Sequence, residues 1–231
     1  LYDDSFIEEI ERLLESKKQL IFQGPPGTSK THFAIQLAKK LEGKNPKLIQ
    51  FHPSYSYENF VEGITIQSDG GFKPKSQIFL RKAEDARESP DKDVFLIIDE
   101  INRGLLGKIF GELIIGLEYR EDQRFELPYS GDSITIPNNL VLFGTMNPAD
   151  KSIALVDYAL RRRFFFIEMM PNESILRGWL ENNSALVDDV KERVVSLFNS
   201  INNQIKSDTS LGEDFQIGHT YYFVSDESKM E

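Results

Sequence analysis

Short, mostly continuous apolar runs alternate along the chain with longer stretches in which apolar residues recur at helical spacing. The runs predict strands at residues 19–23, 47–51, 94–98, 140–144 and 163–167. Runs of this kind are typical of strands that are buried on both faces of a parallel sheet. The pattern therefore predicts an α/β fold with a mostly parallel five-stranded sheet flanked by helices.

Helical spacing marks residues 4–14 and 33–41, and it returns at residues 174–203. Between the third and fourth runs, residues 125–128 and 133–137 predict a hairpin that turns at residues 129–132. The change to helical spacing near Pro171 predicts a domain boundary. We expect an α/β domain of residues 1–170 and a small helical domain of residues 171–231.

A glycine-rich loop joins the first predicted strand to the following helix. It contains Gly24, Pro25, Pro26, Gly27, Thr28, Ser29, Lys30 and Thr31 and nearly matches the phosphate-binding pattern G-x-x-x-x-G-K-[ST]. Backbone N–H groups of such a loop cradle phosphates at the positive end of the helix, Lys30 would reach the β and γ oxygens, and Thr31 would bind Mg²⁺. The alternative is a chance turn, but a strand before the loop and an amphipathic helix after it favour phosphate binding.

Two carboxylates, Asp99 and Glu100, follow the third strand, 68 residues after Thr31. Adjacent carboxylates at the exit of a buried strand are costly unless something uses them. Asp99 would hold Mg²⁺, and Glu100 would orient and deprotonate an attacking water. A lone Asp-Glu pair is often only a strand end that meets solvent, so the prediction depends on the phosphate loop.

Asn147 follows the fourth strand, where a polar side chain can contact the γ-phosphate and the attacking water. Asn147 and Asp150 also imitate the Asn-Lys-x-Asp pattern with which many GTPases read guanine, although the lysine is absent. We favour phosphate sensing for Asn147 and group Asp150 with the nucleotide-binding residues. A simple polar turn is the alternative.

Three arginines, Arg161, Arg162 and Arg163, precede the last strand. One cation is enough to interact with the end of a helix dipole. An arginine that reaches a γ-phosphate can accelerate hydrolysis about 10³–10⁵-fold. If such an arginine comes from a neighbouring subunit, the enzyme must assemble to work. The alternatives are a solvated basic patch and a contact with nucleic acid.

Composition removes several classes of protein. The absence of cysteine excludes a disulfide framework, a zinc finger, a thiol nucleophile and an iron–sulfur site. The net charge of −10 would repel DNA and anionic membranes. No apolar run approaches the roughly 20 residues that span a bilayer, so we expect no membrane partner and a cytoplasmic location. Because the chain begins at Leu1 rather than Met, we expect it to be part of a longer protein.

Sequence blocks spread over nearly the whole chain make it similar to the AAA+ superfamily, and within it to the McrB-type motors of modification-dependent restriction systems. The blocks are residues 24–31, 50–60, 97–103, 144–152, 156–164 and 215–221. The resemblance implies a P-loop AAA+ domain with a C-terminal helical lid and a Mg²⁺-dependent GTPase. It also implies a homo-oligomeric, hexameric ring, in which Arg162 and Arg163 would complete the site of a neighbouring subunit, and a McrC-like nuclease partner. DNA would be contacted through domains that are not present in this chain.

Three positions depart from the pattern of that family. Lys151 stands in place of an arginine, Gln216 in place of a positively charged residue, and Ser29 in place of a glycine. The sequence does not determine which nucleobase is recognised, so ATP can be the substrate instead of GTP. Two alternative hypotheses stay open. One is an ATP-hydrolysing AAA+ remodelling or loader protein that is not linked to restriction, and the other is a nucleotide-binding scaffold subunit without activity.

Overall fold

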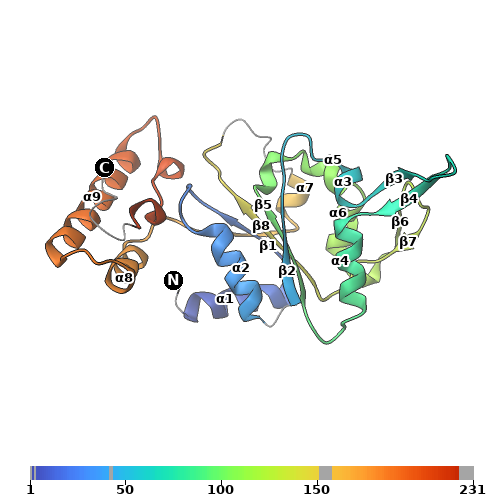
Figure 1. The fold of residues 1–231 in the computed structure, drawn as a ribbon, viewed down its shortest axis with the longest axis horizontal. Helices are drawn as coiled ribbons and strands as arrows, with labels where there is room; N and C mark the ends of the chain where they lie inside the picture. Colours follow the sequence, from blue (N-terminus) through green and yellow to red (C-terminus); the bar gives the residue numbers. More distant parts are fainter. Residues whose placement is uncertain (1, 3, 42–43, 151–157, 224–231) are drawn as a thin grey trace.

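The structure is a computed structural model that describes residues 2, 4–41, 44–150 and 158–223. Its centre is a sheet of five parallel strands in the order β2-β5-β8-β1-β9 (Figure 1). The strands are β1 (Gln19–Gln23), β2 (Lys44–Gln50), β5 (Val94–Asp99), β8 (Leu140–Met146) and β9 (Phe165–Glu168). The predicted five-stranded parallel sheet is confirmed, and the strand bounds differ from the apolar runs by at most three residues.

Helices cover both faces of the sheet because its strands carry large apolar side chains on both sides. In β5, Leu96 and Ile98 belong to the core of one face, and Phe95 and Ile97 to the core of the other. The first face is covered by α3 (Tyr57–Phe60), α4 (Ile78–Arg87), α5 (Leu106–Phe110) and α6 (Leu113–Tyr119). The second is covered by α1 (Asp4–Ser16) and α2 (Lys30–Lys40). This arrangement leaves the ends of the strands as the place where polar side chains can gather.

Two antiparallel hairpins extend from the first face (Figure 1). The hairpin of β6 (Phe125–Glu126) and β7 (Ser133–Ile134) agrees with the one predicted from the sequence. The other, formed by β3 (Glu62–Ile66) and β4 (Phe72–Ser76), was not predicted.

The C-terminal part of the chain is helical and has a small core of its own. It contains α8 (Glu173–Asn183) and α9 (Asp188–Ser207), which pack around Leu176, Leu180, Leu186, Val194, Val195 and Phe198. The remaining short helices are α7 (Tyr158–Arg161), η1 (Ile101–Arg103), η2 (Arg120–Asp122), η3 (Glu213–Phe215) and η4 (His219–Tyr222). Figure 1 shows the red segment that contains η4 beside the blue loop after β1. Within the described part of the chain, no helix combines the length and apolar character needed to cross a membrane.

Candidate active site

The carboxyl ends of β1, β5 and β8 meet at one edge of the sheet because β8 lies between the other two. A cavity of about 300 Å³ opens there. It is lined by Pro26, Gly27, Thr28, Ser29, Lys30, Thr31, His32, Asp99, Glu100, Thr145, Met146, Asn147 and Thr220. In open α/β sheets, ligands bind outside the carboxyl ends of the strands, so the candidate site lies where the fold favours it.

Ser29 occupies the last position of the phosphate loop before α2. Its backbone is left-handed, with φ 66° and ψ 17°. A residue with a Cβ pays roughly 1–2 kcal/mol in this region, whereas glycine enters it freely. The glycine of the pattern therefore has a conformational reason, and in this chain a serine adopts the left-handed conformation instead.

Lys30 is folded back across its own loop. Its Nζ donates hydrogen bonds to the carbonyl oxygens of Gly24 at 2.8 Å and Pro25 at 2.6 Å. Burial lowers the pKa of Lys30 to about 8, against the opposing effect of the Glu100 and Asp99 charges. A partly desolvated ammonium held by neutral carbonyls is a group that an anionic ligand would stabilise.

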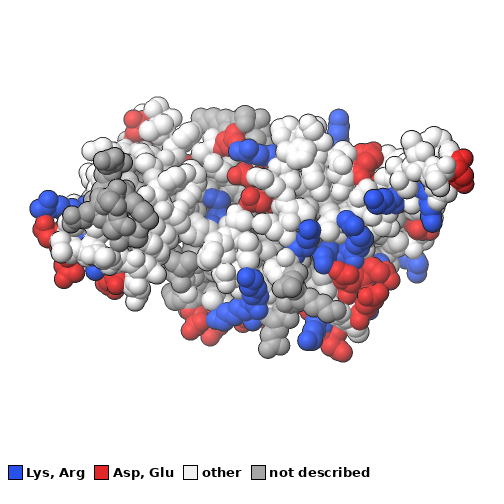
Figure 2. Space-filling view, in the orientation of Figure 1, with Lys and Arg blue, Asp and Glu red and all other residues white. Residues whose placement is uncertain are grey.

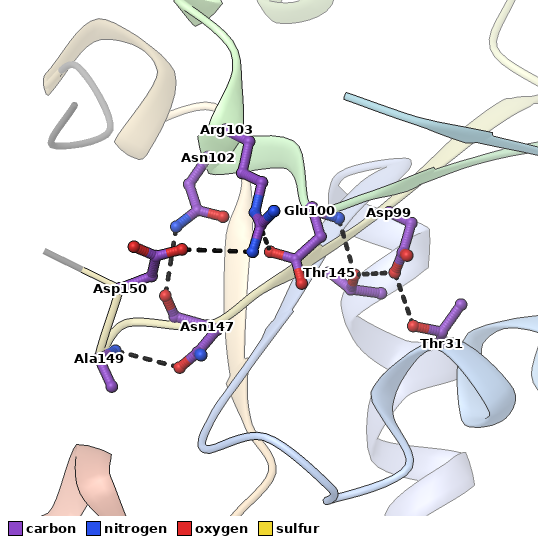
Figure 3. A network of polar contacts seen from close by, with 9 residues as sticks. All are labelled: Thr31, Asp99, Glu100, Asn102, Arg103, Thr145, Asn147, Ala149 and Asp150. Carbon is purple, nitrogen blue, oxygen red and sulfur yellow. Dashed lines mark hydrogen bonds and ion pairs between the residues drawn. The ribbon is translucent and has the colours of Figure 1, made fainter. Parts of the chain in front are cut away.

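Asp99 is the centre of a tight cluster of oxygen atoms (Figure 3). The hydroxyls of Thr31 and Thr145 both donate to Asp99 Oδ1, each at 2.6 Å. A hydroxyl and a carboxylate that converge beside the cavity are hard oxygen ligands of the kind that Mg²⁺ prefers. Mg²⁺ is usually held by one or two protein groups together with substrate phosphates. The Thr31 hydroxyl and the Asp99 carboxylate fit that ion. The described residues contain no group of three His, Asp or Glu side chains that could hold a metal by themselves.

Glu100 stands at the end of β5 in a strained conformation, with φ 51°. Non-glycine residues with positive φ cost about 1–3 kcal/mol and are concentrated at functional sites. Its N–H donates to the Thr145 hydroxyl at 3.2 Å, which fixes the turn. Glu100 Oε2 lies 3.3 Å from Arg103 Nε, but this buried oxygen has no hydrogen-bond partner among the described residues. Glu100 also lines the cavity, and a carboxylate beside a polar cavity can accept a hydrogen bond from a water molecule.

Asn147 is held by contacts on both its main chain and its side chain. Its carbonyl oxygen accepts a hydrogen bond from Asn102 Nδ2 at 3.2 Å, and its Oδ1 accepts one from the N–H of Ala149 at 3.1 Å. The amide NH₂ group is then the end of the side chain that can donate to a ligand. Asp150 is not among the residues that line the cavity, and its carboxylate pairs with Arg103 at 3.4 Å. Figure 3 shows Arg103 between Glu100 and Asp150.

The three arginines differ in their surroundings. Arg163 is almost buried, with 7% of its side chain exposed, and binds Glu118 Oε2 at 2.6 Å and the Ala159 carbonyl at 2.6 Å. The side chain of Arg162 is 56% exposed and lies 3.2 Å from the same Glu118 oxygen. The Arg161 guanidinium lies 5.7 Å from the centre of the Phe166 ring. None of the three lines the cavity of its own chain.

Four residues that line the cavity were not predicted as site residues: His32, Thr145, Met146 and Thr220. Thr145 lies within the block 144–152, so its position at the end of a strand was a usable signal. Thr220 reaches the loop from 193 residues away along the chain, and the linear pattern gives no sign of that contact. Lys151, the departure noted after Asp150, lies outside the described residues.

Two proteins to which the chain is similar are components of restriction enzymes. The chain is 42% identical over 234 residues to the type IV methyl-directed restriction enzyme EcoKMcrB subunit of Escherichia coli (strain K12), which covers 95% of this chain and 50% of that protein. It is 24% identical over 212 residues to the type II restriction enzyme BsuMI component YdiS of Bacillus subtilis (strain 168), covering 69% of this chain and 60% of that protein. The chain thus spans about half to three fifths of these relatives.

A crystal structure of a candidate ATPase from Cytophaga hutchinsonii has a TM-score of 0.46 and 15% identity, over 94% of this chain and 56% of that one. At that TM-score it adds nothing to the fold described above. The protein family that matches residues 19–164 is the AAA domain of the dynein-related subfamily. This match covers well over half of the chain. The resemblance predicted from the sequence is confirmed: the chain belongs to the dynein-related subfamily of AAA domains and is similar to McrB-type subunits.

Proposed function

We propose that this chain binds a nucleoside triphosphate with Mg²⁺ in the cavity and hydrolyses it. The observation that carries the proposal is the cluster of Thr31, Asp99 and Thr145, with Lys30 and Glu100 on the same cavity. It brings together a cation for the phosphates, oxygen ligands for a divalent ion and a carboxylate beside them. Mg²⁺, when bound, would neutralise charge on the phosphate oxygens.

Each of these residues has one task in the proposed reaction. Backbone N–H groups of residues 24–31 hold the phosphates. Lys30 exchanges its hydrogen bonds to the loop carbonyl oxygens for hydrogen bonds to phosphate oxygens. Thr31 and Asp99 hold the ion. Glu100 accepts a proton from the attacking water. Asn147 orients that water or donates to the γ-phosphate through its amide NH₂ group.

The arginines are proposed to act on the neighbouring subunit of a ring. The support is that none of them lines the cavity of its own chain. Arg162 is the best placed, because its side chain is 56% exposed. Arg163 remains part of the same proposal, but its burial against Glu118 suits a residue that holds Arg162 and the preceding helix in place. Ring assembly and the number of subunits, which we expect to be six, are part of this proposal.

The wider role is proposed from the two restriction proteins to which the chain is similar. We place the chain as the motor part of a methyl-directed restriction system. It would work with a McrC-like nuclease and contact DNA through domains outside this chain, in the cytoplasm. Figure 2 shows acidic and basic side chains interspersed over the visible face, without a broad basic field. This face therefore offers no broad basic surface for DNA.

Hydrolysis of GTP and ATP measured side by side tests the proposal. GTP is the proposed substrate, and a clear preference for ATP would favour the remodelling or loader alternative.

Lys30→Ala should abolish nucleotide binding, with Lys39→Ala on the exposed face of the same helix as its control. Glu100→Gln should bind nucleotide as tightly as the unsubstituted chain and lose at least about 100-fold in turnover, because the amide cannot accept a proton. Glu88→Gln, which replaces an exposed carboxylate, is the matched control. Full turnover by Glu100→Gln would show that another base acts.

A further inference from the structure

The segment of residues 218–221, called the strap below, lies directly on the phosphate loop (Figure 1). The N–H of Gly218 donates to the Pro26 carbonyl at 3.0 Å. The N–H and the hydroxyl of Thr220 both donate to the Gly27 carbonyl, at 3.0 and 2.9 Å. Two consecutive carbonyl groups of the loop are therefore bound by the strap.

These hydrogen bonds fix the direction of the N–H groups of the loop. In a trans peptide the carbonyl and the following N–H point in opposite directions, and no cis peptide occurs among the described residues. Because the carbonyls of Pro26 and Gly27 face the strap, the N–H groups of Gly27 and Thr28 turn away from it. N–H groups of such a loop are the ones that bind phosphate oxygens. The strap thus sets the orientation on which anion binding depends.

His219 adds a side-chain contact to the residue that breaks the loop pattern. It is completely buried, and its Nε2 lies 3.4 Å from Ser29 Oγ. The N–H of Asn172 donates to Nδ1 at 3.4 Å, so the proton of the neutral ring belongs on Nε2, which donates to Ser29. This contact holds Ser29 in the left-handed conformation that glycine would adopt without help.

The strap approaches the loop too closely for a side chain at Gly218. A Cβ there would lie 2.0 Å from the carbonyl carbon of Gly27 and 2.5 Å from the Pro26 oxygen. Since φ of Gly218 is −65°, its backbone suits any residue, and only the close approach requires glycine. Gly178 in α8 is the opposite case, because a Cβ there meets nothing within 4 Å.

We propose that the strap is a positioning element of the nucleotide site. Gly218 and Thr220 hold the loop N–H groups toward the phosphates, and His219 holds Ser29 in its left-handed conformation. Nucleotide affinity therefore depends on docking of the C-terminal helical part onto the loop. This inference rests on the proposed function, since it concerns the same site.

The first test compares Gly218→Ala with Gly178→Ala. Both add one methyl group to the C-terminal helical part, but only the first pushes the strap off the loop. We expect Gly218→Ala to weaken binding of fluorescent GTP or ATP with Mg²⁺ by about tenfold or more, and Gly178→Ala to change it less than about twofold. Equal affinities in the two variants would overturn the strap proposal alone. Failure of the unsubstituted chain to bind either nucleotide would overturn the proposed function as well.

The second test uses two amides that imitate different nitrogens of His219, and it decides the matter if Gly218→Ala does not fold. His219→Gln can place an NH₂ group near the Nε2 position and keep the contact with Ser29. His219→Asn can keep an acceptor for Asn172 but does not reach Ser29. We expect the asparagine variant to bind nucleotide about fivefold more weakly and the glutamine variant to stay within about twofold.

Ser29→Gly separates positioning from packing. Glycine adopts the left-handed conformation by itself, so His219→Asn should lose its effect on affinity in the Ser29→Gly chain. A packing role for His219 would weaken affinity equally with serine and with glycine at position 29. That result would overturn the proposed role of His219.

Discussion

Acid should weaken the C-terminal helical part of the chain through His219. Burial, reinforced by the charge of Lys30, lowers the pKa of His219 from 6.5 to about 4. The unfolded chain therefore takes up a proton as the pH falls below 6.5, while the folded chain stays neutral at this site until about pH 4. The sign follows directly: stability is complete above pH 6.5 and is lost as the pH falls toward 4.

The size of the effect follows from the same two values. Between pH 7.5 and pH 5.5, a pKa of 6.5 in the unfolded state and about 4 in the folded state gives a loss of about 1.4 kcal/mol in the free energy of unfolding. This loss is large enough to resolve in a denaturation curve. His219→Gln removes the titrating group and should remove this part of the pH dependence.

The chain carries a suitable probe, because its one tryptophan is Trp179 in α8. The ring of Trp179 stacks on Phe223 at 4.5 Å, and Phe223 lies 5.9 Å from the His219 ring. Urea unfolding followed by tryptophan fluorescence at pH 7.5 and pH 5.5 therefore reports on the part that contains His219. If the unsubstituted chain and His219→Gln lose the same stability between these pH values, the buried neutral histidine is not the cause.

Two further predictions concern the arginines. Arg163→Ala should lower the free energy of unfolding by about 2 kcal/mol, because it removes a nearly buried charged partner of Glu118. Arg162→Ala should lower it by less than about 1 kcal/mol, because the Arg162 side chain is mostly exposed. Thermal unfolding of the two variants measures the difference. In a ring, Arg162→Ala and Lys30→Ala chains should each be inactive alone and should recover part of the hydrolysis when mixed, because a mixed interface can join an intact loop with an intact arginine. A mixture that forms rings and stays inactive would show that Arg162 acts on its own subunit or not at all.

The sheet and the site at its edge could be predicted because both depend on local patterns. Five apolar runs gave the strands, and a parallel sheet brings the ends of its strands to one edge. The loop at residues 24–31 and the carboxylates Asp99 and Glu100 are each encoded in consecutive residues. Their approach, with Thr31 and Asp99 joined at 2.6 Å, then follows from the topology.

The features that the sequence could not predict depend on exposed strands or on distant partners. The hairpin of β3 and β4 carries Ile64, Ile66 and Phe72 on its surface, so its apolar residues do not mark a buried face. The arginines look alike in the sequence, and Arg162 and Arg163 both pair with Glu118, yet the fold buries Arg163 and leaves Arg162 mostly exposed. No periodicity contains that information.

The hydrogen bond from His219 can offset part of the conformational cost of serine at position 29. A serine in a left-handed conformation is less stable than glycine by roughly 1–2 kcal/mol, and a hydrogen bond from a buried neutral imidazole can offset about 1 kcal/mol of it. The same hydrogen bond satisfies the ring nitrogen that burial has removed from water. On our proposal, docking of the strap therefore lowers the conformational cost of serine at position 29. A chain with glycine at position 29 would bind nucleotide with less dependence on its C-terminal helical part.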